Sequence, residues 1–274
     1  MIYLREYMPS EQKVNHPNLY PYNTLSGKFA EPLELSEITI FYGENGCGKS
    51  TLLNLIALKL GIEGAEEYCY GQMFIDRFNE ESSYSMAYNE KGIQYDVPEN
   101  SRYIKSEDML YEVKKIQQEK ALRMGYVYEA AHSGTDTKAL RAKLFQDSSM
   151  NFLTFEGELL FDKLKFRQEK YSNGETSLQI FESFLQPDAI FLLDEPEVSL
   201  SLQSQLKLSN MINEMVRFFN CQFIIATHSP LMLSQLRGVI YDFDQPTVRR
   251  AKWFELGNVK YMYEFFKKHE SKFE

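Results

Sequence analysis

A glycine-rich stretch from Gly43 to Thr51 is the part of the sequence with the most specific chemistry. Its letters, GENGCGKST, match the phosphate-binding pattern G-x-x-x-x-G-K-[S/T] at every fixed position. Glycines let the backbone curl so that successive N–H groups, at the positive end of a helix dipole, point at phosphate oxygens. In this pattern Lys49 reaches the β- and γ-phosphates and Ser50 holds magnesium. The sequence therefore predicts a site for a nucleoside triphosphate and Mg²⁺, formed by Gly43, Glu44, Asn45, Gly46, Cys47, Gly48, Lys49, Ser50 and Thr51.

Two adjacent carboxylates follow the apolar run Ala189–Leu193. A continuous apolar run of this length is typical of a strand buried in a parallel sheet, and open α/β sheets bind ligands at the carboxyl ends of their strands. Consecutive strand residues point to opposite faces, so the two carboxylates can serve different roles. We expect Asp194 to hold Mg²⁺ through its water shell and Glu195 to orient and deprotonate the water that attacks the γ-phosphorus.

Two further polar segments are candidates for the same site. The apolar run Gln222–Ala226 is followed by Thr-His-Ser-Pro, which places His228 near the same sheet edge and within reach of the γ-phosphate or the attacking water. The segment Tyr171–Glu175, YSNGE, opens an expected helix, and a Ser and a Gly at a helix N-terminus form an anion site. Taken alone, that segment is also explained as an ordinary helix cap.

The elements that must position these residues follow an α/β rhythm. Ile38–Tyr42 predicts a buried strand and Lys49–Leu60 a helix that ends at Gly61. Further helices are predicted over 175–185 and 201–219, and strands over 189–193, 222–226 and 239–241. This alternation predicts a mostly parallel sheet flanked by helices.

The region after the first helix has a different composition, rich in Glu, Tyr, Ser and Asn, with a helix expected from Ser106 to Met124. We therefore predict a single domain over 1–274. Residues 1–61 and 186–274 would form the nucleotide-binding core, and residues 62–185 an inserted helical lobe that ends in the helix opened by YSNGE.

The four motifs GENGCGKST, YSNGE, FLLDEPE and ATHSP, in this order between Ile38 and Pro230, resemble the Walker A, signature, Walker B and switch-histidine motifs of ABC-type P-loop ATPases. The form DEPE followed by ATHSP is more similar to the SMC, RecF and overcoming-lysogenization-defect group than to transporter subunits. The opening Tyr3-Leu4-Arg5-Glu6 and the end of the chain also resemble small stand-alone bacterial ABC ATPases labelled AAA family ATPase.

The resemblance implies the fold of an ABC-type head, in which an N-terminal antiparallel β portion accompanies the mostly parallel sheet. It also implies a head-to-tail homodimer that sandwiches two ATP–Mg²⁺, with hydrolysis releasing the dimer. It places the signature of one subunit over the ATP of the other. The residues acting in trans would be Ser172, Asn173, Gly174 and Glu175. The residues acting in cis would be Lys49, Ser50, Thr51, Asp194, Glu195 and His228, with Glu195, His228 and Lys49 as the catalytic set and Ser50 and Asp194 as the metal set.

The sequence departs from the family pattern at several positions. Asn173 stands where the signature has its first glycine, which Asn tolerates because it adopts left-handed backbone more readily than most residues. Ser201 stands where the loop after Walker B usually has an Asp. Gln72 and Glu107 are alternative candidates for the additional metal contact between core and lobe. For adenine stacking, Tyr20 or Tyr22 is a candidate, a surface turn being the alternative.

Bulk properties exclude several classes of protein. A net charge of −9 argues against broad attraction to nucleic acids or anionic membranes, so DNA binding is weakly supported. The basic residues between Lys163 and Lys170 could form a DNA-binding strand, but we interpret them as a solvated face. Asp242 and Asp244 could bind a metal ion, but we interpret them as the end of a strand. Three widely spaced cysteines indicate a reducing compartment, and no apolar run approaches a membrane span. We expect a cytoplasmic protein with no membrane partner.

The leading hypothesis is an ATP hydrolase that drives a partner, such as a nuclease or another effector, in DNA repair, genome maintenance or defence against mobile elements. One alternative is the nucleotide-binding subunit of an ABC transporter. Another is a regulatory module that binds ATP with little hydrolysis.

Overall fold

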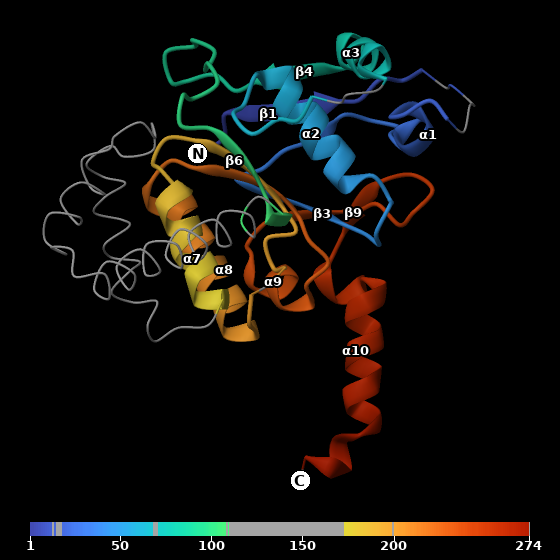
Figure 1. The fold of residues 1–274 in the computed structure, drawn as a ribbon, viewed down its shortest axis with the longest axis vertical. Helices are drawn as coiled ribbons and strands as arrows, with labels where there is room; N and C mark the ends of the chain where they lie inside the picture. Colours follow the sequence, from blue (N-terminus) through green and yellow to red (C-terminus); the bar gives the residue numbers. More distant parts are fainter. Residues whose placement is uncertain are drawn as a thin grey trace, which may run out of the picture. The chain divides into compact units, whose positions relative to one another are not determined.

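The computed structural model describes residues 1–12, 14, 18–67, 71–107, 109, 173–198 and 200–273. The chain forms two compact units, one made of Met1–Ser106 with Leu185–Glu274 and the other of Glu107–Phe184. The second unit contributes helix α7 (Asn173–Phe184), where a helix over 175–185 is predicted. Every other helix and strand given below belongs to the first unit (Figure 1).

The centre of the first unit is a six-stranded sheet with the strand order β5-β6-β7-β3-β8-β9. All neighbours pair in parallel except β8 and β9, which pair antiparallel, so the predicted mostly parallel sheet is confirmed. The strands are β3 (Ile38–Tyr42), β5 (Arg102–Lys105), β6 (Ile190–Asp194), β7 (Gln222–Ala226), β8 (Val239–Asp242) and β9 (Arg249–Ala251).

Strands β3, β6 and β7 are buried at every position, which explains their continuous apolar sequences. On one face, Ile190, Leu192 and Ile224 join a core cluster with the side chains of helix α2 (Lys49–Leu60). In Figure 1 α2 lies on one side of the sheet, and helices α8 (Leu202–Phe218) and α9 (Pro230–Gln235) lie on the other.

Helix α2 has the predicted limits because a glycine stands at each end. Gly48 has φ 106° and Gly61 has φ 65°, both in the left-handed region that glycine adopts without strain. The amide of Gly61 donates to the carbonyls of Ala57 and Leu58, which ends the helix. The phosphate-binding loop therefore runs directly from the end of β3 into the N-terminus of α2.

A separate three-stranded antiparallel sheet, β2-β1-β4, confirms the predicted N-terminal antiparallel portion. Its strands are β1 (Leu4–Met8), β2 (Leu33–Glu34) and β4 (Ser83–Met86). The side chain of Gln222 on β7 ties the two sheets together. It accepts hydrogen bonds from the amides of Tyr3 (2.9 Å) and Leu4 (2.8 Å) and donates to the carbonyls of Leu4 (2.7 Å) and Ser36 (3.1 Å).

The other described helices of the first unit are α1 (Tyr22–Leu25), α3 (Gln72–Glu81), η1 (Trp253–Glu255), α10 (Gly257–Lys268) and η2 (Glu270–Lys272). The residues assigned from sequence to the inserted lobe are split between the units, because β4, α3 and β5 lie before Glu107. The lobe limits of 62 and 185 stay a prediction. Within the described part of the chain, no helix has both the length and the apolar character needed to cross a membrane.

Candidate nucleotide site

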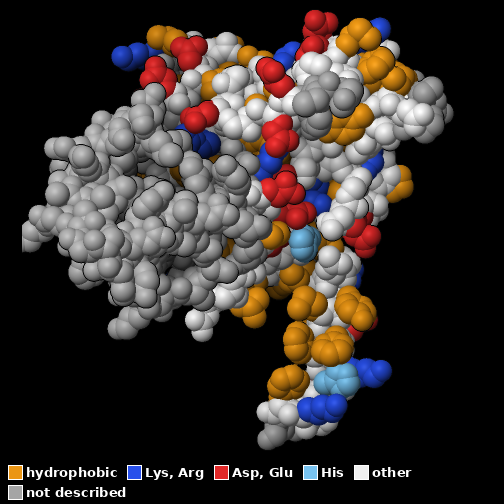
Figure 2. All heavy atoms as spheres, viewed as in Figure 1, with side chains coloured by type: hydrophobic (Ala, Val, Ile, Leu, Met, Phe, Trp, Pro, Cys, Tyr) orange, Lys and Arg blue, Asp and Glu red, His pale blue; other side chains and the backbone are white. Residues whose placement is uncertain are grey.

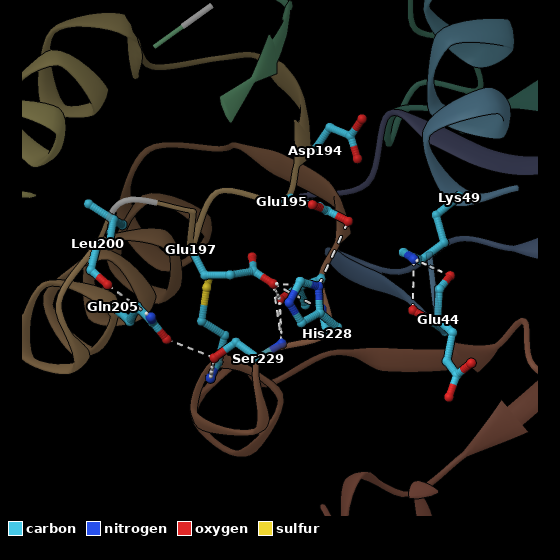
Figure 3. A network of polar contacts seen from close by, with 12 residues as sticks. Glu44, Lys49, Asp194, Glu195, Glu197, Leu200, Gln205, His228 and Ser229 are labelled. Carbon is cyan, nitrogen blue, oxygen red and sulfur yellow. Dashed lines mark hydrogen bonds and ion pairs between the residues drawn. The ribbon is translucent and has the colours of Figure 1, made fainter. Parts of the chain in front are cut away.

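The phosphate-binding loop encloses the ammonium group of Lys49. Its Nζ donates to the carbonyl of Gly43 over 2.7 Å and to the carbonyl of Glu44 over 3.0 Å, and the residue is 3% exposed (Figure 3). Lys28 donates from outside the loop to the carbonyl of Cys47 over 2.7 Å. Two cations are thus held at the backbone of this loop, which favours an anionic ligand.

Two glycines of the loop are required by close packing. A Cβ at Gly48 would lie 2.8 Å from Cδ2 of Leu25 and 2.9 Å from Cγ2 of Thr24. A Cβ at Gly43 would lie 2.9 Å from Oδ1 of Asp244, the same oxygen that accepts the Glu44 amide over 2.7 Å. Strand β8 ends at Asp242, one residue beyond the predicted strand over 239–241. Asp244, just past this strand, holds the loop through its hydrogen bond with the Glu44 amide.

The predicted metal residues lie together. Ser50, in the first turn of α2, donates from its hydroxyl to Oδ1 of Asp194 at the end of β6 over 3.0 Å. The other carboxylate oxygen accepts from the hydroxyl of Tyr103 on β5 over 3.3 Å. Asp194 is 8% exposed, and this burial raises its pKa. The nearby charge of Glu195 acts in the same direction, while the hydrogen bonds from Ser50 and Tyr103 and the charge of Lys105 oppose it.

Glu195 follows β6 and His228 follows the neighbouring strand β7, and their side chains face each other (Figure 3). Nδ1 of His228 lies 3.8 Å from Oε1 of Glu195. Glu195 has φ 48°, a left-handed conformation that costs a non-glycine residue free energy and is frequent at functional sites. Its amide donates to the carbonyl of Ala226 over 2.9 Å, which holds this turn against the end of β7.

Glu197 is a residue of the site that the sequence analysis did not single out. Its Oε1 accepts hydrogen bonds from the Thr227 hydroxyl (2.6 Å) and from the amides of His228 (2.9 Å) and Ser229 (3.2 Å). The same oxygen lies 3.5 Å from Nδ1 of His228, and the side chain is 6% exposed. One buried carboxylate therefore holds the loop that carries the histidine.

The other predicted residues are placed as follows. Gln72 begins α3 and donates to Oδ1 of Asp76 over 2.7 Å, and Glu107 is exposed at the start of the second unit. Ser201 caps α8, because its hydroxyl accepts the amide of Ser204 over 3.2 Å. The segment Asn173–Glu175 forms the start of α7, whereas Ser172 and the basic residues from Lys163 to Lys170 lie outside the described residues.

The two tyrosines considered for adenine differ. Tyr22 is 3% exposed, its ring packs edge-on against Phe78 with centroids 5.0 Å apart, and its hydroxyl donates to Glu81 over 2.7 Å. Adenine stacking by Tyr22 is therefore wrong, as is a surface turn at this residue, because the ring belongs to the core. Tyr20 is half-buried, and its hydroxyl donates to Oγ1 of Thr51 over 3.1 Å, so it contacts the end of the phosphate-binding loop.

Residues 57–234, more than half of the chain, match the model of a family described as "AAA domain, putative AbiEii toxin, Type IV TA system". The chain belongs to this family. Membership of this AAA family confirms the resemblance to P-loop ATPases that the four motifs predict. Three of the motifs, GENGCGKST, FLLDEPE and ATHSP, lie at the carboxyl ends of β3, β6 and β7.

More distant similarities extend to an ATP-binding protein, to a part of an ABC transporter complex and to an Smc head domain. The lipoprotein-releasing system ATP-binding protein LolD of Buchnera aphidicola is 23% identical over 215 residues, which cover 74% of this chain and 79% of LolD. Among solved structures, cbiO1 of Clostridium perfringens, part of an ABC transporter complex, is 16% identical with a TM-score of 0.47, covering 98% of this chain and 97% of cbiO1. The Smc head domain of Pyrococcus furiosus is 13% identical with a TM-score of 0.44, covering 98% and 100%. Sequence identities and TM-scores this low assign no function to the AAA-family chain.

Four residues of the site were missed from the sequence: Lys28, Tyr103, Glu197 and Asp244. Glu197 lies within the DEPE motif, so its position was visible even though its role was not. Tyr103 and Asp244 belong to no motif: Tyr103 lies on β5 beside β6, and Asp244 follows β8 beside β3.

Proposed function

We propose that this AAA-family protein hydrolyses ATP to ADP and phosphate, with Mg²⁺ bound by Ser50 and Asp194. The observation that carries the proposal is the convergence of three strand ends: the loop after β3 holds Lys49, β6 ends in Asp194 and Glu195, and the loop after β7 carries His228. Lysine, carboxylate and hydroxyl groups at one edge of a parallel sheet are what nucleoside triphosphate binding needs.

The residues fit both ligands. Ser50 and Asp194 offer two hard oxygen atoms 3.0 Å apart at the N-terminus of α2, and Mg²⁺ in nucleotide sites is held by one or two such groups and by phosphate oxygens. Bound there, Mg²⁺ would neutralise charge on the transferred phosphoryl group. The backbone amides of Gly46–Thr51 and the ammonium of Lys49 would bind the phosphates.

The chain's own acid–base groups would act on water. Glu195 would orient the attacking water and accept its proton on the carboxylate. His228, on the facing loop, would hold the γ-phosphate or the water in line for attack. Glu197 touches neither in this scheme, and it would act by positioning the His228 loop through the three hydrogen bonds to its Oε1.

A complete site would require a second subunit. Ser172, Asn173, Gly174 and Glu175 would contact the ATP bound to the other subunit, so that ATP holds the homodimer together and hydrolysis releases it. Ser201, where related ATPases have an Asp, is engaged in capping α8, so communication between the two sites would use other residues. Gln72 and Glu107 remain alternative candidates for the additional metal contact.

The cellular role proposed is defence against mobile elements, with DNA repair or genome maintenance as the wider class. The description of the matching family, a toxin of a type IV toxin–antitoxin system, supports defence. The ATP-dependent closure of the homodimer would drive a protein partner, such as a nuclease or another effector. We expect both proteins to act in the cytoplasm. The similarity to LolD supports a second candidate, the ATP-binding subunit of a transporter.

The experiment that tests the proposal is ATP turnover per subunit measured over a range of protein concentrations, with Glu195→Gln as the control. We expect the rate per subunit to rise with concentration and to vanish in Glu195→Gln, which would still bind ATP. Lys49→Ala should lose ATP binding itself. A rate near zero at all concentrations, unchanged in Glu195→Gln, would contradict hydrolysis and favour an ATP-sensing module.

A membrane test separates the second candidate. If the protein purified from its native cells were found with a membrane protein whose removal abolishes turnover, the transporter function would replace the proposed one. Turnover by the isolated protein that is unaffected by membranes would support a stand-alone ATPase.

A further inference from the structure

Strand β5 supplies two side chains to the part of the sheet where the metal residues lie. β5 pairs in parallel with β6, and the register places Tyr103 beside Leu192 and Lys105 beside Asp194. Residues paired in this way on neighbouring strands project to the same face of a sheet. Tyr103 and Leu192 both belong to the core cluster that includes side chains of α2, so this is the face that α2 covers. Tyr103 and Lys105 therefore lie on the same face as the Asp194 carboxylate.

The two carboxylate oxygens of Asp194 have different donors. Oδ1 accepts the hydroxyl of Ser50 over 3.0 Å, and Oδ2 accepts the hydroxyl of Tyr103 over 3.3 Å. Ser50 is exposed, whereas Tyr103 is only 2% exposed. The terminal torsion of an aspartate has broad minima, so a carboxylate held by one donor alone can rotate. Two donors from different elements fix which oxygen lies beside the exposed serine and which lies beside the buried tyrosine.

The segment that follows α2 holds Tyr103 in this position. The amide of Tyr103 donates to the carbonyl of Glu63 over 2.8 Å. A Cβ at Gly64, which has φ 93°, would collide with the carbonyl oxygen of Tyr103, so glycine allows the segment to lie this close to β5. The segment is itself tied to α2, because the backbone amide and carbonyl of Glu66 pair with the buried side chain of Asn54 over 2.8 Å and 3.0 Å. The phenol is therefore fixed by contacts that do not involve the nucleotide residues.

The charge of Lys105, next to Tyr103, is balanced by a carboxylate. Nζ of Lys105 lies 5.1 Å from the centroid of the Tyr103 ring and forms an ion pair with Glu66. The charge of Lys105 and the hydrogen bond from Tyr103 both favour the ionised form of Asp194, against the effect of burial on its pKa. Tyr103 does so as a neutral donor. A neutral hydroxyl orients a carboxylate without adding a positive charge, which would repel a metal cation.

We propose that Tyr103 is a positioning residue for Mg²⁺ binding, which holds Oδ2 of Asp194 and leaves Oδ1, beside Ser50, for the metal and its waters. This inference rests on the proposed function, because it concerns the metal site of that reaction. Tyr103 touches neither the nucleotide nor the metal and acts through Asp194. Groups that orient metal ligands in this way typically change the metal affinity by roughly 10- to 100-fold when they are removed.

The test measures how strongly Mg²⁺ tightens nucleotide binding to the full chain. Isothermal titration calorimetry with the non-hydrolysable β,γ-imido analogue of ATP gives two dissociation constants, one with EDTA and one with Mg²⁺, and their ratio is the metal effect. Tyr103→Phe is expected to reduce this ratio about tenfold and to leave the affinity in EDTA unchanged. Phenylalanine keeps the buried ring, so the variant folds, which circular dichroism checks.

Tyr241→Phe is the matched control. Tyr241 is 6% exposed on β8, and its hydroxyl donates to the carbonyl of Glu34 over 3.0 Å, so this variant also loses one hydroxyl from a buried ring of the sheet. It should keep the wild-type ratio. In the Asp194→Asn background, Tyr103→Phe should change the ratio no further, because its effect passes through the carboxylate. A further fall in that background would overturn positioning through Asp194.

Three other outcomes would overturn the inference. The first is a wild-type ratio in Tyr103→Phe, which would leave the proposed ATPase function intact. The second is an equal loss of affinity with Mg²⁺ and with EDTA, which would assign Tyr103 to the fold rather than to the metal. The third is a wild type whose affinity is the same in both conditions, which would also contradict the Mg²⁺ site of the proposed function. Because the analogue is not hydrolysed, a protein that binds ATP without hydrolysing it would fail the turnover test and still pass this one.

Discussion

The hydroxyl of Thr227 donates a 2.6 Å hydrogen bond to Oε1 of Glu197, a carboxylate 30 positions earlier in the chain. That oxygen also accepts the amides of the next two residues, His228 and Ser229. The loop after β6, which begins with Glu195, and the loop that carries His228 are thus joined by one buried side chain. Oε2 of Glu197 has no hydrogen-bond partner among the described residues, so Oε1 provides the described contacts of this carboxylate.

Glu197→Ala is expected to destabilise the fold and to lower ATP turnover by an order of magnitude or more. It leaves the Thr227 hydroxyl and the His228 amide without the acceptor described here, whereas the Ser229 amide keeps a second acceptor, Oγ1 of Thr227, at 3.1 Å. Each buried unpaired donor costs about 1–3 kcal/mol. Glu197→Gln keeps an acceptor oxygen and should cost less. Urea unfolding and amide hydrogen exchange at residues 228 and 229 measure the effect without nucleotide.

Thr227→Val is the matched control for this prediction, since it removes one donor and keeps the carboxylate. Its cost should be smaller than that of Glu197→Ala, with exchange at 228 and 229 still slow. Equal exchange rates in wild type and Glu197→Ala would show that the carboxylate does not hold the histidine loop.

Asp194→Asn is expected to raise the Tm of the nucleotide-free protein near neutral pH. Burial raises the Asp194 pKa above its ordinary value of 3.8, so the folded state binds a proton more readily than the unfolded chain. Between the ordinary and the raised pKa, stability falls as pH rises, and above both the ionised group destabilises the fold. The variant keeps the shape and removes the charge.

The measurement is Tm for both proteins from pH 4 to pH 8. The advantage of the variant should grow as pH rises and then level off, while its affinity for ATP–Mg²⁺ should fall. A lower Tm for Asp194→Asn at pH 7 would mean that the charge stabilises the fold.

Gly48→Ala is expected to lower the free energy of unfolding by ~2 kcal/mol, because φ 106° strains any residue with a Cβ. That Cβ would also lie 2.8 Å from Leu25. Gly257→Ala is the control, since its Cβ would meet nothing within 4 Å and its φ is not left-handed. Denaturant unfolding should give the control a change of no more than ~0.5 kcal/mol. Equal costs would contradict the packing argument.

Gln222→Leu is expected to cost ~3 kcal/mol or more. The amide side chain makes four hydrogen bonds to the backbone between the two sheets, and leucine of similar size can make none. Thermal unfolding and hydrogen exchange in β1 are the measurements. Gln245→Leu, which removes one half-buried hydrogen bond to Asp242, is the control and should cost ~1 kcal/mol or less.

If β1 exchanged its amides at the wild-type rate in Gln222→Leu, the two sheets would be joined chiefly by apolar contacts. The result would then limit the role of Gln222 to filling space in the core.

The local sequence was sufficient to predict many of the helices and strands of this fold. The buried strands β3, β6 and β7 could be predicted because parallel strands covered on both faces need apolar residues at every position. The limits of α2 could be predicted because Gly48 and Gly61 provide left-handed backbone at its two ends. The phosphate-binding loop follows from the same local rule, since its chemistry depends on backbone amides in a contiguous segment.

The tertiary structure alone decided which other side chains complete the site. Tyr103 meets Asp194 across 91 positions, and Asp244 meets the amide of Glu44 across 200, through the pairing of neighbouring strands. Strand order depends on the burial of the whole sheet, and no short segment encodes it. The exposure of the apolar side chains of α10 (Figure 2) was equally hidden, because an amphipathic pattern specifies an apolar side of a helix, whereas only the folded chain shows whether that side is covered.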